Sequence, residues 1–478
     1  MAIEDVTRRV FVKGSAAVGG GLVMGGPLSA LAAQTAEGAP RHVLGYGPLQ
    51  PTPEQDSGLV YLELPRGFRY RIISRQGQIM SDGNPTPGVM DGTGAFPGPR
   101  GTTILIRNHE NRSRPNEIPV VVPPSDRYDP DPNVRGGNTK LVVDRQRNVI
   151  QSFAVLGGKH TNCAGGVTPW NTWITCEEIF NYGSVENNTT PGTGVPHGYA
   201  FEVPADAEGP VNPIPITDAG RFAREAVAWL DGILYQTEDR GDAVLYRYVP
   251  SRQPREFGDL ATFGGTLQAL VVRNRPNLDA DTANPGESYP AEWVTIDNPN
   301  PPVESGGQST RAQGQAKGAA IFSRTEGAWT SGNRIYFDCT DGGEANLGQV
   351  WEYIPRGKDR GELKLVYEST SAEDLEAPDN LVVVPATGDV WLQEDGGGDQ
   401  YVRGVTRRGE IYDFARTVLF DSEFCGGCFS PDGRTFFLSQ QGGRPADPLN
   451  PPNDDAGVTY AIWGPFEQTD AREGPAEV

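Results

Sequence analysis

The chain has 478 residues, and its 62 aspartate and glutamate residues outnumber the 41 lysine and arginine residues, giving a formal net charge of −21. So acidic a protein repels nucleic acid and anionic membranes, and we expect the mature form to bind neither; the charge favours hard cations instead. Glycine (61 residues) and proline (41 residues) fall at turn positions, which favours an all-β protein with many loops.

The N-terminus has the features of an export signal. Arg8 and Arg9 precede a glycine-rich apolar run from Gly14 to Leu31, which ends on an A-x-A cleavage site at residues 30–32. We predict a twin-arginine signal peptide over residues 1–32, passage through the twin-arginine translocase, and a periplasmic or secreted protein. The alternative is an N-terminal membrane anchor. No other segment has the roughly 18 apolar residues that a membrane span needs.

Six segments share one pattern: a turn, then an alternating apolar strand, then a polar or acidic end. They are ILIRNHE (104–110), TWITCEE (172–178), ILYQTED (233–239), IYFDCTD (335–341), VWLQED (390–395) and FFLSQQ (436–441). Six strand units without helical periodicity predict a six-bladed β-propeller over residues 58–466, with long loop insertions. Equivalent strand ends surround one axis in that fold, so we expect a ring of acids: Glu110, Glu178, Asp239, Asp341 and Asp395.

The flanking segments follow from this arrangement. We expect an N-terminal arm over 33–57, a first outer strand in LELPRGFRYRIIS (62–74) and a C-terminal tail over 467–478. Long loops are expected at 112–138 and 273–317 because both stretches are rich in proline, asparagine and glycine. The apolar segment VTYAIWGPF (458–466) is expected to return and close the first blade.

The stretch from His160 to Glu178 carries the strongest chemical signal. A turn at residues 168–171 separates two strands, so Cys163 and Glu178 should meet at one end of a hairpin. A thiolate beside carboxylates, in a chain with only five cysteines, predicts a metal site. About 15 residues before the end of most repeats stands a second such residue: Cys163, Glu225, Glu326, Asp379 and Cys425.

The other cysteines and the histidines offer weaker signals. Cys425 and Cys428 form a C-G-G-C sequence that is compatible with a redox pair, a disulfide or neither. Cys176 and Cys339 alternate into strand interiors, where we expect small core residues. For His109 we expect a hydrogen-bonded structural role.

Taken together, these motifs resemble the PhoX-type alkaline phosphatases. The resemblance rests on TRRVFVK, DGTGAF, RNHE, NCAGGVTPWNTWITCEE, TEDRGDAVLYRY, EGA, PDN followed by GDVWLQED, and FSPDGRTFFLSQQ, and it spans about residues 58 to 466. It implies a twin-arginine-exported six-bladed propeller that hydrolyses small phosphate monoesters. It also implies two iron(III) ions bridged by an oxo group, together with three calcium ions. We expect a monomer.

The resemblance assigns roles to individual residues. Cys163 matches the iron-binding cysteine, and Arg324 matches the phosphate-binding arginine. The metal-binding carboxylates match Glu178, Glu225, Glu326 and Asp379, with Glu394 or Asp395 as a further candidate. Two positions depart from the family pattern: Arg224 stands where a histidine is common, and CGGC replaces a glutamate-containing GCE.

These residue types suit the implied chemistry. Carboxylates favour calcium and iron(III), a thiolate favours iron over calcium, and a guanidinium grips two phosphate oxygens at once. If Arg324 and Glu326 share a strand, they share a face, so we expect both in one catalytic cavity. A salt bridge to a ring acid is the simpler role for Arg324. Two other functions remain open: a calcium-dependent propeller hydrolase of lactones or organophosphates, and a non-catalytic, metal-stabilised binding propeller.

Overall fold

Short antiparallel strands form nearly all of the regular structure in the computed structural model. The structure describes residues 44–113, 117–182, 194–279, 283–420, 422–442 and 456–467. The predicted signal peptide, the arm up to residue 43 and the tail from residue 468 lie outside the described residues. Within them, no helix is long and apolar enough to cross a membrane.

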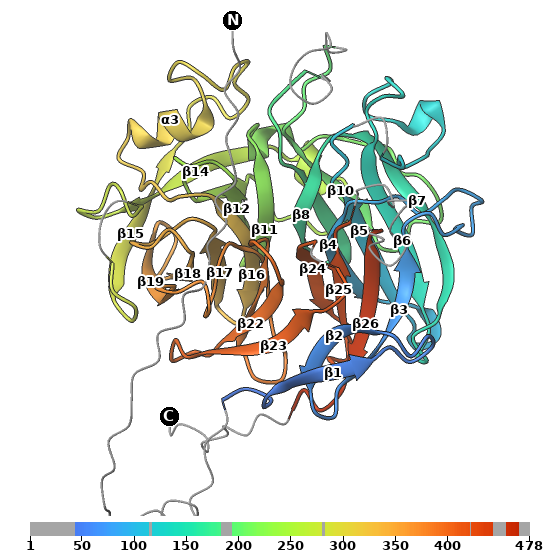
Figure 1. Ribbon diagram of the computed structural model, residues 1–478. Helices are drawn as coiled ribbons and strands as arrows, with labels where there is room; N and C mark the ends of the chain where they lie inside the picture. Colours follow the sequence, from blue (N-terminus) through green and yellow to red (C-terminus); the bar gives the residue numbers. More distant parts are fainter. Residues whose placement is uncertain are drawn as a thin grey trace, which may run out of the picture. The chain divides into compact units, whose positions relative to one another are not determined.

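Six groups of antiparallel strands begin with the strand pairs that the sequence predicts; the third and fourth groups are joined in one nine-stranded sheet. Each group lies beside the next in chain order (Figure 1). The strands, group by group, are β4 (Met90–Pro97), β5 (Thr103–His109), β6 (Gly136–Val143) and β7 (Val149–Lys159); β8 (Asn162–Val167), β9 (Thr172–Glu177) and β10 (Ala200–Pro204); β11 (Arg224–Leu230), β12 (Ile233–Glu238), β13 (Tyr246–Pro250) and β14 (Gly265–Val272); β16 (Thr325–Ser331), β17 (Arg334–Cys339), β18 (Gln349–Pro355) and β19 (Arg360–Glu368); β20 (Pro378–Val383), β21 (Val390–Glu394), β22 (Tyr401–Val405) and β23 (Ile411–Thr417); and β24 (Phe424–Phe429), β25 (Phe436–Gln440), β26 (Val458–Trp463) and β3 (Arg69–Arg75).

The first strands of the six groups form a closed ring. β4 contacts β8, β8 contacts β11, β11 contacts β16, β16 contacts β20, β20 contacts β24, and β24 returns to β4. The chain is therefore a six-bladed β-propeller, as predicted, with β4, β8, β11, β16, β20 and β24 lining its axis. Apolar side chains fill the space between blades; Trp391 of the fifth blade, for example, meets Phe436 of the last blade edge to face, with ring centroids 5.0 Å apart.

The ring closes differently from the expectation. The C-terminal strand β26 does not close the first blade but pairs with β25 in the last one, and the N-terminal strand β3 pairs with β26 to complete that blade. The prediction of closure in the first blade was wrong because both ends of the chain show the same alternating pattern. The last blade is thus built from both ends of the domain.

Three further strands extend this plan. β1 (Leu49–Pro53) lies within the predicted arm, yet it pairs with β2 (Val60–Pro65), which extends the fifth blade through β23. β15 (Ser288–Thr295) comes from the predicted loop 273–317 and pairs with both β14 and β19. The same insertion contains α3 (Thr310–Gln315), and two further short elements are α2 (Asp259–Thr262) and a 3-10 turn at Thr217–Ala219.

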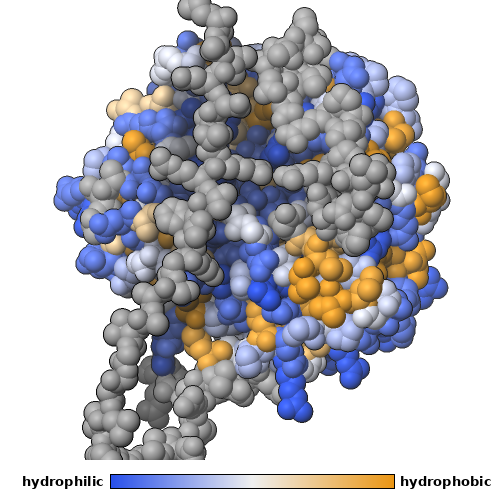
Figure 2. All heavy atoms as spheres, viewed as in Figure 1, coloured by the Kyte–Doolittle hydropathy of each residue, from blue (hydrophilic) through white to orange (hydrophobic). Residues whose placement is uncertain are grey.

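The surface agrees with the acidic composition. Figure 2 shows that the visible described face is mostly hydrophilic, with hydrophobic residues gathered in separate patches. The predicted core cysteines Cys176 and Cys339 are fully buried among apolar residues, as expected. His109 is also buried and hydrogen-bonded, through Nδ1 to the Gly88 carbonyl and through Nε2 to the Thr139 hydroxyl, as predicted.

Candidate metal centre

Every strand that lines the axis carries an irregularity at the same level. In β4 the register shifts between Met90 and Thr93, so that Asp91 and Gly92 together oppose Asn108. Such a bulge interrupts the alternation of side chains and re-aims one of them. The other five axial strands shift at equivalent places. The residues that these bulges present are Asp91, Cys163, Glu225, Glu326, Asp379 and Gly426.

A glycine or alanine follows five of these six positions and lets neighbouring axial strands touch; the exception is Asn380, which follows Asp379. A Cβ atom on Gly92 would lie 2.5 Å from the Ala164 Cα, and one on Gly327 would lie 2.6 Å from the Leu381 nitrogen. Only glycine fits at such distances. The bulges are therefore packed against one another around the axis, and this packing brings their side chains together.

Side chains from the second strands hold the bulges in place. Asn108 Nδ2 donates to the carbonyl oxygens of Cys163 (2.6 Å) and Ala164 (2.7 Å) in the next blade. The Thr237 hydroxyl donates to the Glu326 carbonyl, again one blade ahead. Because these side chains are buried and hydrogen-bonded, the positions of the bulged residues are fixed before any ligand binds.

The ends of the second strands lie at the same end of the axis, as the sequence predicts. Arg324 connects two of the acids, since its guanidinium lies 2.7 Å from Asp239 and 3.7 Å from Asp341. Burial raises the pKa of Glu178, and the negative charge of Asp239 raises it further. Burial also raises the pKa of Glu110, and the negative charge of Asp395 adds to that shift. The predicted ring of acids is therefore present.

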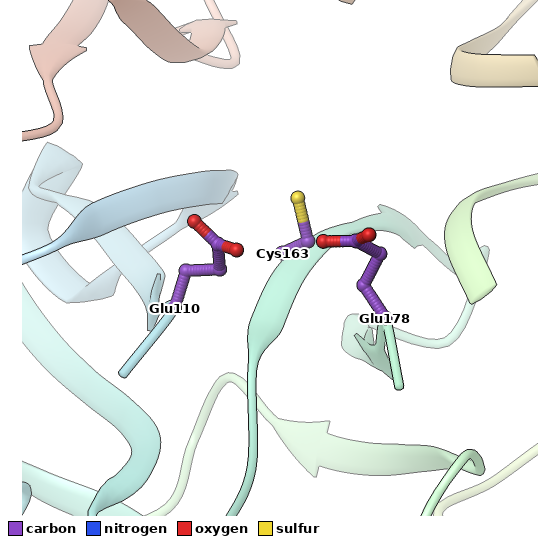
Figure 3. A group of neighbouring side chains, drawn as sticks. All are labelled: Glu110, Cys163 and Glu178. Atoms are coloured by element: carbon purple, nitrogen blue, oxygen red, sulfur yellow. The ribbon is translucent and has the colours of Figure 1, made fainter. Parts of the chain in front are cut away.

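Bulge residues and strand ends together form three groups of possible metal ligands in the described part of the chain. Within each group the ligand atoms lie within 4.8 Å of one another. Figure 3 shows one group, with the Cys163 thiol between the carboxylates of Glu110 and Glu178. The groups are Glu110, Cys163 and Glu178; Asp91, Glu110 and Glu423; and Glu225, Glu326 and Asp379.

Cys163 links these groups. Its side chain is buried, and its Sγ lies 3.0 Å from Glu225 Oε1 and 3.6 Å from Asp91 Oδ2. Burial raises the pKa of the thiol, and the charges of Asp91 and Glu225 raise it further. Without a cation the thiol is therefore protonated and donates to Glu225. A cation among these groups would reverse that preference.

The carboxylates show the same demand for positive charge. Burial raises the pKa values of both Glu225 and Glu326 well above the usual range for a glutamate, and the negative charges of neighbouring acids raise them further. Burial, with Asp395 and Glu110, raises the pKa of Asp379 to about 7. Glu225 Oε2 is buried and has no hydrogen-bond partner among the described residues. These observations fit a site for several cations.

Glu177 and Glu178 are adjacent but serve opposite purposes. Glu178 belongs to the metal-ligand group, whereas Glu177 is fully buried between Lys159 Nζ (2.8 Å) and His197 Nδ1 (2.7 Å). His197 also reaches Asp129 at 3.2 Å. This buried network anchors the end of β9 and thereby the backbone that carries Glu178.

Two ligand candidates escaped the sequence analysis. Asp91 lies in the first bulge, but a longer turn, which includes a 3-10 turn at Pro99–Gly101, places it 19 rather than about 15 residues before Glu110. Glu423 precedes β24 and compensates for Gly426, which has no side chain to offer. The amide nitrogen of Gln441 lies 2.6 Å from Glu110 and 2.5 Å from Glu423.

Four residues that the sequence analysis singled out lie outside the groups, namely Glu394, Asp395, Cys425 and Arg224. Glu394 accepts hydrogen bonds from Arg403 Nε (3.0 Å) and from backbone nitrogens. The negative charge of Asp395 adds to burial in raising the pKa of Asp379. Cys425 stands one position before the bulge residue Gly426, and its thiol contacts the Met90 carbonyl. Arg224 is buried against Gln236 and the Gly220 carbonyl. All five cysteines are free, so C-G-G-C forms no disulfide.

Arg324 reaches the site, although not by the route predicted. It precedes β16 and has a φ of 47°, so the argument that it shares a strand face with Glu326 was wrong. Its backbone nitrogen donates to the Arg240 carbonyl, and its side chain contacts Asp239 twice and Glu326 at 2.8 Å. The side chain is 35% exposed, which leaves it accessible from solvent.

A second arginine, Arg112, lies beside the centre and was not predicted. Its guanidinium contacts Glu110, and the side chain is 40% exposed. The charge of Glu110 raises the pKa of Arg112, with smaller contributions from Glu178 and Cys163. Positive charge therefore lies at two places on the rim of an otherwise acidic centre.

The family model of the alkaline phosphatase PhoX matches residues 44–155 and 147–443, which hold the whole of this centre. The chain belongs to the PhoX alkaline phosphatase family. It is accordingly a phosphomonoesterase, and its substrates are phosphate esters. The PhoX structure of Pseudomonas fluorescens in complex with vanadate, a transition-state analogue, is 17% identical; the match covers 90% of this chain and all of that one, with a TM-score of 0.66.

More distant matches to solved structures include other propellers. The RRP9 WD40 repeats are 7% identical with a TM-score of 0.39, and the match covers 87% of this chain and 100% of that one. The WD40 propeller domain of Doa1 is 8% identical with a TM-score of 0.38, and the match covers 82% and 96% of the two chains. Among proteins with curated functions, none matches.

Proposed function

We propose that this PhoX-family phosphatase is exported and that it hydrolyses phosphate monoesters at an iron–calcium centre on the propeller axis. The observation that supports this proposal most directly is the set of matched bulges, which directs Asp91, Cys163, Glu225, Glu326 and Asp379 to one place. A lone acidic cluster is common at protein surfaces. An acidic cluster that six equivalent bulges hold beside a buried thiol is a far more specific sign of a metal site.

The donor set suggests how the ions would be distributed. Cys163 would bind iron, with Glu225 as its neighbour at 3.0 Å, because thiolate ligands prefer iron to calcium. The carboxylate groups around Glu110 and Glu326 would hold calcium and further iron. When bound, these ions would offset the carboxylate charge and act as Lewis acids toward the phosphate. We propose two iron(III) and three calcium ions from the family resemblance.

Arg324 would orient the substrate. A carboxylate that ligates a cation has less charge to offer a guanidinium, so Glu326 would leave donors of Arg324 free for two phosphate oxygens. Asp239 would still hold the guanidinium from the side, through Nε. Arg112 lies at a second place on the rim and would offset charge near Glu110.

Cys163→Ser tests the role of iron. A hydroxyl is a poorer iron ligand than a thiolate, and we expect the variant to fold but to lose iron and nearly all turnover of a chromogenic phosphate ester. Cys428→Ser is the matched control, because Cys428 is equally buried but lies in an apolar cluster away from the acids. Elemental analysis and melting curves of both variants measure the difference.

Full activity of Cys163→Ser with unchanged metal content would end the iron assignment. A protein that contains calcium without iron and hydrolyses lactones would favour the alternative hydrolase. Metal binding without any turnover would favour a binding propeller.

Export rests on the sequence of residues 1–32. Changing Arg8 and Arg9 together to lysine should retain the precursor in the cytoplasm, as cell fractionation would measure. Normal export of that variant would refute the twin-arginine assignment.

A further inference from the structure

Two neighbouring blades are joined at both edges. β15 pairs with β14 on one side and with β19 on the other, and the axial strands β11 and β16 contact each other directly. Figure 1 shows β15 at the outer edge, beside β14 and β19. The nine strands therefore enclose a space, as the wall of a barrel does. Buried side chains, among them Tyr235, Trp351 and Leu363, fill its middle.

The end of this enclosure that faces away from the metal centre remains open. The turns that border it, around Asp231 and at 356–359, lie at the strand ends opposite to Glu225 and Asp239. A cavity of about 680 Å³ lies there, whereas the one on the propeller axis holds about 20 Å³. Small-molecule sites usually measure about 300–1,000 Å³ and often occupy the mouths of β-barrels.

Arg247 is the central polar group of this cavity. It is 2% exposed, and its guanidinium lies 4.6 Å from the centre of the Trp293 ring. Nε donates to Gln268 (2.7 Å), and Nη1 donates to the Lys358 carbonyl (2.9 Å). These contacts fix the plane of the guanidinium, which is the kind of preorganised donor that a binding site needs.

The charges around the cavity are balanced. Arg247 and Lys358 stand against Asp231 and Asp359, and Asp359 Oδ1 already lies 3.3 Å from the Arg247 guanidinium. The described residues that line the cavity therefore carry no net positive charge to hold an anion, and the net charge of −21 of the whole chain opposes anions further. The cavity therefore favours a neutral ligand.

The remaining lining combines hydrogen-bonding and apolar groups. Thr266, Thr295 and Gln268 can donate and accept, which suits hydroxyl groups that do both. Ile233, Val249 and Pro355 offer apolar surface beside them. Alternating hydroxyl and C–H surface is the character of a sugar.

We propose that the mouth of the nine-stranded enclosure binds a neutral polyhydroxylated molecule of mono- or disaccharide size. The ligand hydroxyls meet Arg247, Gln268 and the two threonines, and its C–H groups cover the apolar lining. This site lies at the opposite end of the blades from the metal centre. It is independent of phosphate hydrolysis and does not rest on the iron–calcium assignment.

Saturation-transfer NMR and calorimetry on the mature protein test the site, with glucose, maltose and inorganic phosphate as probes. We expect saturable binding of at least one saccharide, with a dissociation constant of about 1 mM or tighter, which corresponds to about −4 kcal/mol. Phosphate should not compete with it. Thr266→Trp and Thr295→Trp each fill the exposed mouth from a different strand and should weaken binding at least tenfold.

Thr370→Trp is the matched control, because it adds the same ring at an exposed threonine that does not line the cavity. All three variants should keep the phosphatase activity and melting temperature of the wild type. Absence of saccharide binding overturns the proposal. So does undiminished binding in both mouth variants, and competition by phosphate overturns the neutral class of ligand.

Discussion

The role of Arg324 can be tested by a substitution that removes the paired donors of its guanidinium and keeps the positive charge. In the structure Nε and Nη2 contact both oxygens of Asp239, at 2.7 and 3.2 Å, which shows that the guanidinium can grip two oxygens side by side. Arg324→Lys leaves one ammonium group in its place. Charge-assisted hydrogen bonds contribute about 1.5–3 kcal/mol, and each 1.36 kcal/mol is a factor of about ten. The value of kcat/KM should therefore fall roughly tenfold to a hundredfold.

The assay measures kcat/KM with a chromogenic ester, the inhibition constant of free phosphate, and the melting temperature on one preparation. We expect weaker phosphate inhibition, with metal content and melting temperature close to those of the wild type. Arg240→Lys is the control, because Arg240 makes a similar ion pair with Glu304 (2.8 Å) but its side chain contacts no member of the ligand groups, whereas Arg324 contacts Glu326. A fall in melting temperature with unchanged phosphate inhibition would show that Arg324 is only a structural ion pair.

Two further predictions concern stability. Burial raises the pKa of Glu394 from an ordinary value near 4.5 to about 7, although the adjacent charge of Arg403 opposes this shift. The contribution of Glu394 to stability is therefore complete below pH 4.5 and is lost as the pH rises through 7. Glu394→Gln should remove this pH dependence, about 3 kcal/mol in the free energy of unfolding, and leave the metal content unchanged. Denaturation curves at several pH values measure it, and a free energy of unfolding that falls with pH as steeply as in the wild type, or lost metal, would contradict the prediction. Gly426 has a φ of 62°, and a Cβ there would lie 2.4 Å from the Asp91 carbonyl oxygen, so Gly426→Ala should destabilise the fold by more than the roughly 1–2 kcal/mol of left-handed strain and lower the metal content. Gly433→Ala, with a φ of 70° and nothing nearer than 3.8 Å, is the control, and equal effects on melting temperature and metal content would refute this reasoning.

The strand pairs and much of the centre could be predicted because they depend on local patterns. Each hairpin is short, so turn chemistry and alternation determine which residues meet, as for Cys163 and Glu178. Counting back about 15 residues from the end of each repeat failed where the local geometry changed. The longer first turn concealed Asp91, and at the last blade Cys425 was chosen instead of Gly426, one residue further on, because a cysteine carries chemistry and a glycine does not.

Other features depend on partners far apart in the sequence. Nothing near Glu423 indicates that its carboxylate meets Asp91 and Glu110, since the three come together only when the ring closes. The left-handed backbone of Arg324 depends on the Arg240 carbonyl of the preceding blade. Likewise, alternation in 288–295 indicates a strand but not that it bridges two blades. Such contacts need the packed structure.

The pairing of β3 with β26 has a consequence for biosynthesis. Arg69 is opposite Trp463, so the last blade has to wait until the ribosome has made nearly the whole domain. Until then β3 has an unpaired edge, and the ring of axial strands remains open. Such long-range closure is slow, and a product that stops before β26 would expose two edges for aggregation. A cell that makes this protein therefore benefits from keeping each chain away from other nascent chains until the final strand has arrived.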